Sequence, residues 1–291
     1  MSVPSPLRKS PFDFRQRPPY PRRPPRIQKL KGEDVTVCIA SICDPGRVIV
    51  AVCDSKLSTG YTSSDRVTLK ARRLSKSWGF MFAGEDVSPI VPIEEALQEE
   101  LKSRPNKLPE VVSLARKAYQ EQLQVKATTL NASLQDTSLG LELLIFGYDE
   151  RSNAHIFTVF DPNAEVAYHD VVGFCAIGSV GYAARSMLYF YGQNKLTHLS
   201  TAIYHTLTAK FMAESASDVG KDTFTVVLER DGKAVPLPLI HVESIRDVWE
   251  EEGKPKMPLD VPSRVSDMFR AAQRFTPQAL DLLGVPHDWR E

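Results

Sequence analysis

Two short apolar runs that flank a tight turn place the strongest constraint on the fold. The runs cover residues 35–42 and 48–53, and Asp44, Pro45 and Gly46 lie between them. Proline followed by glycine is typical of a turn, because proline presets one backbone angle and glycine accepts a positive φ. Both runs are rich in β-branched residues, so the pattern predicts a β-hairpin.

The first run is mostly apolar on both of its faces. Its alternate positions are Thr36, Cys38, Ala40 and Ile42 on one face, and Val35, Val37, Ile39 and Ser41 on the other. A strand of this kind is covered on both sides, which places its sheet between other layers.

The rest of the chain alternates strand runs with pairs of helices. We expect strands over 78–83, 141–148, 156–160, 171–177 and 223–229, and helices over 87–103, from Pro109 onward, over 180–191 and over 199–214. Apolar residues spaced by four, as in Ile93, Leu97 and Leu101, indicate the helices. Strand runs separated by helix pairs fit two packed sheets with helices outside.

The two ends of the chain differ from this body in composition. Residues 1–34 hold nine of the 36 basic residues and eight of the 21 prolines, against three acidic residues. Such a segment is typical of a disordered leader, with a basic docking tail or transit peptide as the alternative. Residues 246–291 form a charged, proline-containing extension with one amphipathic helix, expected over 265–275. The domain between them is expected to cover 35–245.

Charge and cysteine usage narrow the function class. Without the leader the chain carries 27 basic and 33 acidic residues, which argues against a nucleic-acid partner, and the leader lacks an apolar segment of signal-peptide length. We therefore expect no nucleic-acid or membrane partner and a cytoplasmic location.

The cysteines show no C-x-x-C spacing, so free buried thiols are expected rather than a metal site: Cys38, Cys43, Cys53 and Cys175. No cofactor is expected, because the Gly178–Gly181 turn lacks the lysine and spacing of a phosphate-binding loop.

Asp54 directly follows the second run, and Lys70 comes sixteen residues later. The chain thereby resembles the proteasome β-type subunits, a family of N-terminal-nucleophile hydrolases that includes a bacterial ATP-dependent threonine peptidase. Six further fragments carry the resemblance over roughly residues 35–245: the hairpin that starts at Thr36, Asp54-Ser55-Lys56, Ala83-Gly84, Phe146-Gly147-Tyr148-Asp149, Ile177-Gly178-Ser179 and Glu229-Arg230-Asp231-Gly232.

The resemblance implies an α+β fold, a four-layer αββα sandwich, and cleavage of peptide or amide bonds by Thr36. In the family the free α-amine of the threonine is the base for its own hydroxyl. The lysine, here Lys70, lowers the proton affinity of that hydroxyl, and the aspartate, here Asp54, orients the lysine. Gly84 matches the residue whose N–H binds the oxyanion, and Ser179 matches the serine that assists the amine.

The family's Asp-x-x-Ser-Gly-Gly segment has only a partial counterpart in residues 217–221. Aligned backward from the Asp231-Gly232 turn, the position of its aspartate falls on Ala216, so Asp218 takes that role only if the loop shifts. The position of its serine falls on Val219.

Thr36 is also preceded by Val35, where family precursors usually have glycine. A free amine at Thr36 requires cleavage of that bond, or a translation start at Val35 followed by loss of the initiator methionine. Counting back from Asp54 without a gap leads to Cys38 as another nucleophile, but it lies inside a strand.

A catalytically silent subunit that acts as a scaffold or binds a partner is the alternative to an enzyme, and a small-molecule amidase is a third reading. The resemblance further implies a homo-oligomer and brings an ATP-dependent unfoldase into consideration as a partner.

Overall fold

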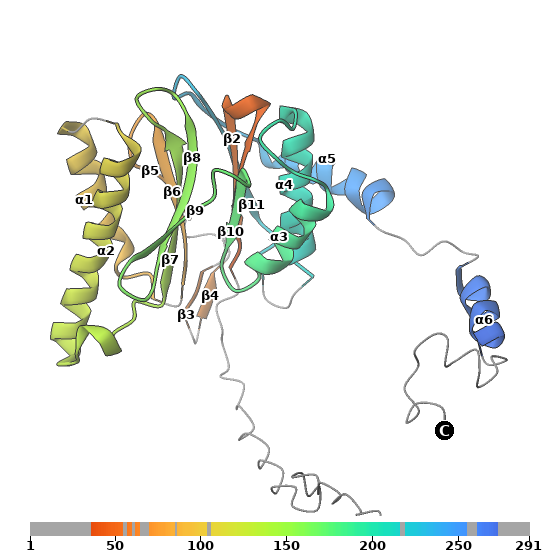
Figure 1. The fold of residues 1–291 in the computed structure, drawn as a ribbon, viewed down its shortest axis with the longest axis horizontal. Coiled ribbons are helices and arrows are strands. Elements are labelled where there is room, and N and C mark those ends of the chain that lie inside the picture. Colours follow the sequence, from red (N-terminus) through yellow and green to blue (C-terminus); the bar gives the residue numbers. More distant parts are fainter. Residues whose placement is uncertain are drawn as a thin grey trace, which may run out of the picture.

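The computed structural model describes residues 36–54, 57–59, 62–64, 70–84, 86–103, 106–215, 219–254 and 261–272. The expected leader and the last part of the expected extension lie outside these ranges. Two five-stranded sheets face each other, and every neighbouring pair of strands in them is antiparallel (Figure 1).

The first sheet has the order β10 (Phe174–Ile177), β1 (Cys38–Cys43), β2 (Val48–Asp54), β11 (Thr223–Glu229) and β12 (Ala234–Pro236). The second has the order β5 (Ala71–Arg73), β6 (Trp78–Gly84), β7 (Leu141–Tyr148), β8 (Ala154–Phe160) and β9 (Glu165–Tyr168). The short strands β3 (Leu57–Thr59) and β4 (Thr62–Ser64) pair with each other.

The predicted hairpin is confirmed. β1 and β2 pair from Cys38 opposite Cys53 to Cys43 opposite Val48, and a short 3-10 turn over Asp44–Gly46 joins them. Gly46 has a φ of +75°, a conformation that side chains with a Cβ rarely adopt.

The two apolar faces of β1 enter two different cores. Cys38, Ala40 and Ile42 lie in the core between the sheets, while Val37 and Ile39 pack under the helices on the outer side of the first sheet. This explains why neither face of the run is polar.

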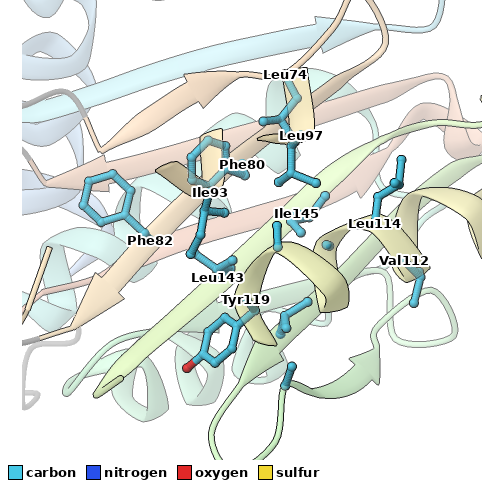
Figure 2. Packing of buried hydrophobic residues seen from close by; sticks show 14 of the residues in the cluster. Leu74, Phe80, Phe82, Ile93, Leu97, Val112, Leu114, Tyr119, Leu143 and Ile145 are labelled. Carbon is cyan, nitrogen blue, oxygen red and sulfur yellow. The ribbon is translucent and has the colours of Figure 1, made fainter. Parts of the chain in front are cut away.

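Helices cover the outer face of each sheet (Figure 1). On the second sheet these are α1 (Ile90–Ser103) and α2 (Leu108–Leu130). Figure 2 shows Ile93 and Leu97 of α1 and Tyr119 of α2 among side chains of the sheet such as Phe80 and Leu143.

On the first sheet the covering helices are α3 (Gly181–Phe190) and α4 (Leu199–Ala213). Then α5 (Leu239–Val248) and a π-helical turn over Trp249–Gly253 pack on α4, where the Trp249 and Phe211 ring centroids are 5.7 Å apart. A last helix, α6 (Val261–Ala272), carries the exposed apolar residues Val265 and Met268. Across the described residues, no helix combines the length and apolarity needed to cross a membrane.

Candidate active site

The antiparallel hairpin brings the start of β1 beside the end of β2. Thr36 lies two residues before β1, and Asp54 is the last residue of β2. The Val37 N–H donates to Asp54 Oδ1 at 3.2 Å, and the Asp54 N–H donates to the Val37 carbonyl at the same distance. The Asp54 carboxylate is therefore held directly under the segment that carries Thr36.

Lys70, immediately before β5, completes this group. Its Nζ donates to Thr36 Oγ1 at 2.8 Å and to both Asp54 carboxylate oxygens at 3.0 Å. The three side chains are buried, with exposed fractions of 5% for Thr36, 0% for Asp54 and 2% for Lys70. The ammonium thus joins a hydroxyl to a carboxylate in a site screened from water.

Burial raises the pKa of the Asp54 carboxyl, and the Lys70 ammonium and the Val37 N–H partly offset this effect. A carboxylate in a buried site is stable as an anion only where a cation and hydrogen-bond donors face it. Lys70 supplies both, so the pair can keep the positive charge beside the Thr36 hydroxyl.

The turn before α3 supports the backbone of Thr36. The Thr36 N–H donates to Ser179 Oγ at 3.3 Å. Gly178 has a φ of +95°, and a Cβ placed on it would lie 2.1 Å from the Thr36 carbonyl oxygen. Only glycine lets the two segments approach so closely.

Gly84 ends β6 on the opposite sheet and lines the same cleft as Thr36. In the antiparallel ladder of β6 with β7, hydrogen-bonded and non-hydrogen-bonded residue pairs alternate. The Tyr148 N–H donates to the Ser77 carbonyl, so that pair is a bonded one. Gly84 and Leu141, seven positions further along the ladder, therefore form a non-bonded pair. The Gly84 N–H is thus not used in the ladder with β7. A Cβ on Gly84 would lie 2.3 Å from the Gly140 carbonyl oxygen, so glycine is required here too.

The cleft has a volume of about 630 Å³, within the usual range for ligand sites. Its lining comes from both sheets and from the turn before α3: Thr36, Ala83, Gly84, Ser138, Gly140, Leu141, Glu142, Phe160, Asp161, Gly178 and Ser179. Thr36 is among these lining residues, and its hydroxyl is bonded to Lys70.

Two carboxylates of the cleft were not singled out in the sequence. Glu142 accepts the Gly178 N–H at 3.3 Å, and burial raises the pKa of its carboxyl. Asp161 accepts the Ser138 hydroxyl at 2.7 Å and the Gly140 N–H at 2.8 Å. Neither belongs to a motif, and the chain has 36 acidic residues, so no sequence signal separates them from the rest.

Asp218 and Cys38 are the remaining candidate site residues from the sequence. Asp218 lies outside the described residues. The Cys38 thiol is fully buried and donates to the Phe82 carbonyl at 3.3 Å. Burial raises the pKa of this thiol well above its usual value, which disfavours the thiolate that a nucleophile needs. Cys38 therefore fits a packing role in the interior better than a catalytic role. All four cysteines are free and buried, and the residues that the structure describes hold no cluster of metal-ligating side chains.

Comparison with known proteins matches the chain to a protein family and to solved structures. A family model described as proteasome subunit matches residues 36–202, more than half of the 291-residue chain. Among solved structures, the chain is similar to Anbu (ancestral beta-subunit) from Yersinia bercovieri, with a TM-score of 0.61 and 14% identity over 77% of this chain and 100% of that one. At this identity the likeness shows the fold alone. A search of curated proteins gives no match.

Proposed function

Because the chain belongs to the proteasome subunit family, we propose that it is a proteasome-like hydrolase that cleaves peptide or amide bonds through Thr36. The observation that carries the proposal is the buried series from Thr36 Oγ1 through Lys70 Nζ to Asp54, with contacts of 2.8 and 3.0 Å. The order of layers, from helices through two sheets to helices, supports the four-layer αββα sandwich that goes with this activity.

In the proposed reaction the α-amine of Thr36 is free and takes the proton of the Thr36 hydroxyl. An α-amine has a reference pKa of about 7.7 to 8.0, so roughly a tenth to a sixth of it is neutral at pH 7, and more at higher pH. Oγ1 then attacks the substrate carbonyl carbon, while the Lys70 ammonium stabilises the developing negative charge on Oγ1. The amine returns its proton to the leaving nitrogen, and an ester to Thr36 remains. Water, deprotonated by the same amine, hydrolyses that ester and restores the threonine.

The oxyanion of each tetrahedral intermediate would accept the Gly84 N–H, which the ladder with β7 does not use. Loss of one such donor typically raises the barrier by about 2.7 to 4 kcal/mol. Ser179, whose Oγ is 3.3 Å from the Thr36 nitrogen, would hold the amine in place and exchange protons with it. Asp218 remains a proposed member of the site on the resemblance alone.

The reaction requires a free amine at Thr36. In the full chain this nitrogen is an amide bonded to Val35, and an amide is not a base. We infer that the Val35–Thr36 bond is cleaved, or that translation starts at Val35 and the initiator methionine is removed. We further propose a homo-oligomer in the cytoplasm, with an ATP-dependent unfoldase as a partner, on the basis of family membership.

The alternative is a catalytically silent subunit, and the Val35–Thr36 amide favours it. The two are separated by comparing the full chain with a form that begins at Thr36, each beside its Thr36→Ala variant, on a panel of fluorogenic peptides and amides. Turnover only in the form that begins at Thr36, lost on Thr36→Ala, supports the hydrolase. Lack of turnover in both forms supports the silent subunit, and turnover that survives Thr36→Ala contradicts the proposed nucleophile.

A further inference from the structure

A second buried ammonium lies at the end of α4. The Lys210 side chain is fully buried, and its Nζ donates to the Glu214 carboxylate, to the Gly220 carbonyl at 2.8 Å and to the Lys221 carbonyl at 3.0 Å. An ammonium has three protons, so these three acceptors use all of its donors.

Helix α5 completes the group through Arg246. Its Nη1 donates to Glu214 Oε2 at 2.6 Å and its Nη2 to Glu214 Oε1 at 3.1 Å, a two-pronged pair. The same Nη2 is 3.3 Å from the Lys221 carbonyl, and the guanidinium lies 4.0 Å from the centre of the Phe211 ring. The backbone of residues 220–221 is thus held from α4 and from α5 together.

This backbone leads directly to the candidate active site. Thr223, two residues after Lys221, is the first residue of β11 and pairs with Asp54. Lys210 also contributes, less than Lys70 does, to lowering the pKa of Asp54. Lys210, Glu214 and Arg246 lie beyond the range that the family model matches, residues 36–202.

Buried ion pairs are often no more stabilising than apolar side chains of similar size, so burial of this one calls for a reason other than stability. An apolar residue at position 210 could not donate hydrogen bonds to the carbonyls of Gly220 and Lys221, as Lys210 does. These carbonyls belong to a connection between a helix and a strand, where no ladder satisfies them.

We propose that Lys210, Glu214 and Arg246 are positioning residues that fix the backbone entering β11 and, through β11, the place of Asp54. Helix α5 is then part of the structure that supports the active site. The effect on turnover rests on the proposed function, whereas the effect on the backbone does not.

The first test is hydrogen exchange in the full chain, with Lys210→Met and Arg246→Met. Both variants should exchange faster, by tenfold or more, at amides of 219–225 and 37–54, with α1 and α2 unchanged. Lys102→Met, at an exposed ion pair with Glu99 on α1, is the matched control and should change neither segment. Normal exchange at 37–54 in both variants overturns the proposal. If Lys210→Met does not fold, Arg246→Met, which leaves Lys210 bonded to Glu214, decides alone.

The second test is turnover in the form that begins at Thr36, which contains every described residue. Lys210→Met should lower kcat by about 10- to 100-fold, the usual effect of a small misplacement, with KM within twofold. Arg246→Lys should retain more of kcat than Arg246→Met, because it keeps a cation and one donor. A change in KM alone, or unchanged kcat, overturns the proposal for turnover.

The pH profile gives a further readout in the same form. Within the described part of the chain, the charged and titratable groups that act on Asp54 or pair beside it include Lys70, Cys38 from β1, Cys53 from β2 and Lys210 from α4. Removing the Lys210 charge favours the protonated carboxyl, so the acid limb of kcat should move to higher pH. An unmoved limb counts against the charge contribution. If the unsubstituted form has no turnover, the proposed function fails, and hydrogen exchange alone decides the positioning role.

Discussion

Among the residues that the structure describes, two lysines are buried, and their roles differ. Lys70 and Lys210 have exposed fractions of 2% and 0%, and each donates to a carboxylate and to further oxygens. The further oxygen at Lys70 is the hydroxyl of Thr36, which lies at a cleft of about 630 Å³. The further oxygens at Lys210 are the carbonyls of Gly220 and Lys221.

The difference lies in what each acceptor can do. A hydroxyl changes its protonation state, and a cation beside it stabilises the alkoxide that a nucleophile needs. A backbone carbonyl has no such chemistry and can only be held in place. A buried ammonium is therefore not by itself a sign of catalysis, and the group it bonds to separates a chemical role from a positioning one.

The carboxylates differ as well. Asp54 has Lys70 as its only ion-pair partner among the described residues, whereas Glu214 is shared by Lys210 and Arg246. Removing each lysine should therefore leave very different charges behind. Substitutions at the two sites should differ accordingly in the free energy of unfolding that they cost.

Lys70→Met should have the largest effect. It leaves Asp54 buried without its cation, and breaking a buried pair in this way typically costs roughly 3 to 5 kcal/mol. Turnover in the form that begins at Thr36 should be lost. Denaturant unfolding and peptide hydrolysis measure the two effects. A variant as stable as the parent would show that Asp54 gains nothing from Lys70.

Lys210→Met should cost less, about 1 to 3 kcal/mol, because Glu214 keeps Arg246 as a cation. What is lost is the contact of Lys210 with Glu214 and its hydrogen bonds to two carbonyls. Lys102→Met, whose side chain is 70% exposed, serves as control and should leave unfolding unchanged. A loss larger than that of Lys70→Met would reverse the ranking of the two sites.

The hairpin and most strands and helices of the body could be predicted because their apolar residues repeat regularly. The strand over 223–229 was predicted with the bounds that the structure gives it. By contrast, β9, β12 and α5 were not predicted. The two strands are short and half exposed, and α5 follows Pro236 and Pro238 with only one fully buried residue, Val242.

Lys210 shows why a local pattern does not reveal every buried charge. In the predicted helix over 199–214 it resembles any solvent-facing lysine. Its burial arises from α5 and from the backbone of 220–221, which lie 10 or more residues further along the chain. Likewise Glu142 and Asp161 enter the cleft only through the pairing of β7 with β6 and β8.

Thr36→Ala should have a smaller effect on stability than either lysine variant. It removes one hydrogen bond from Lys70 and leaves the ion pair intact, so the loss should be about 1.5 kcal/mol, the lower end for a bond to a charged group. Turnover should nevertheless be abolished. The ratio of the two effects separates Thr36 from Lys210, whose loss should affect stability more and turnover less. Thermal unfolding and peptide hydrolysis on the same samples give this ratio. Residual turnover above about 1% of the parent would contradict the assignment of Thr36 as nucleophile. Such turnover would mean that the substitution raises the activation free energy by less than about 2.7 kcal/mol.

The smallest effect should appear in the pH dependence of stability. The pKa of the carboxyl is shifted at the first site, and the pKa of the ammonium is shifted at the second. Burial raises the pKa of Asp54, so its contribution to stability is greatest at low pH and is lost as the pH rises through its folded pKa. Burial lowers the pKa of Lys210, so its contribution is greatest above its unfolded pKa and is lost as the pH falls through its folded pKa. Asp54→Asn should therefore remove a slope in the free energy of unfolding on the acid side, and Lys210→Met a slope on the alkaline side. Denaturant unfolding across the pH range measures both slopes. If either substitution removed both slopes, Asp54 and Lys210 would titrate as one electrostatic unit rather than as two.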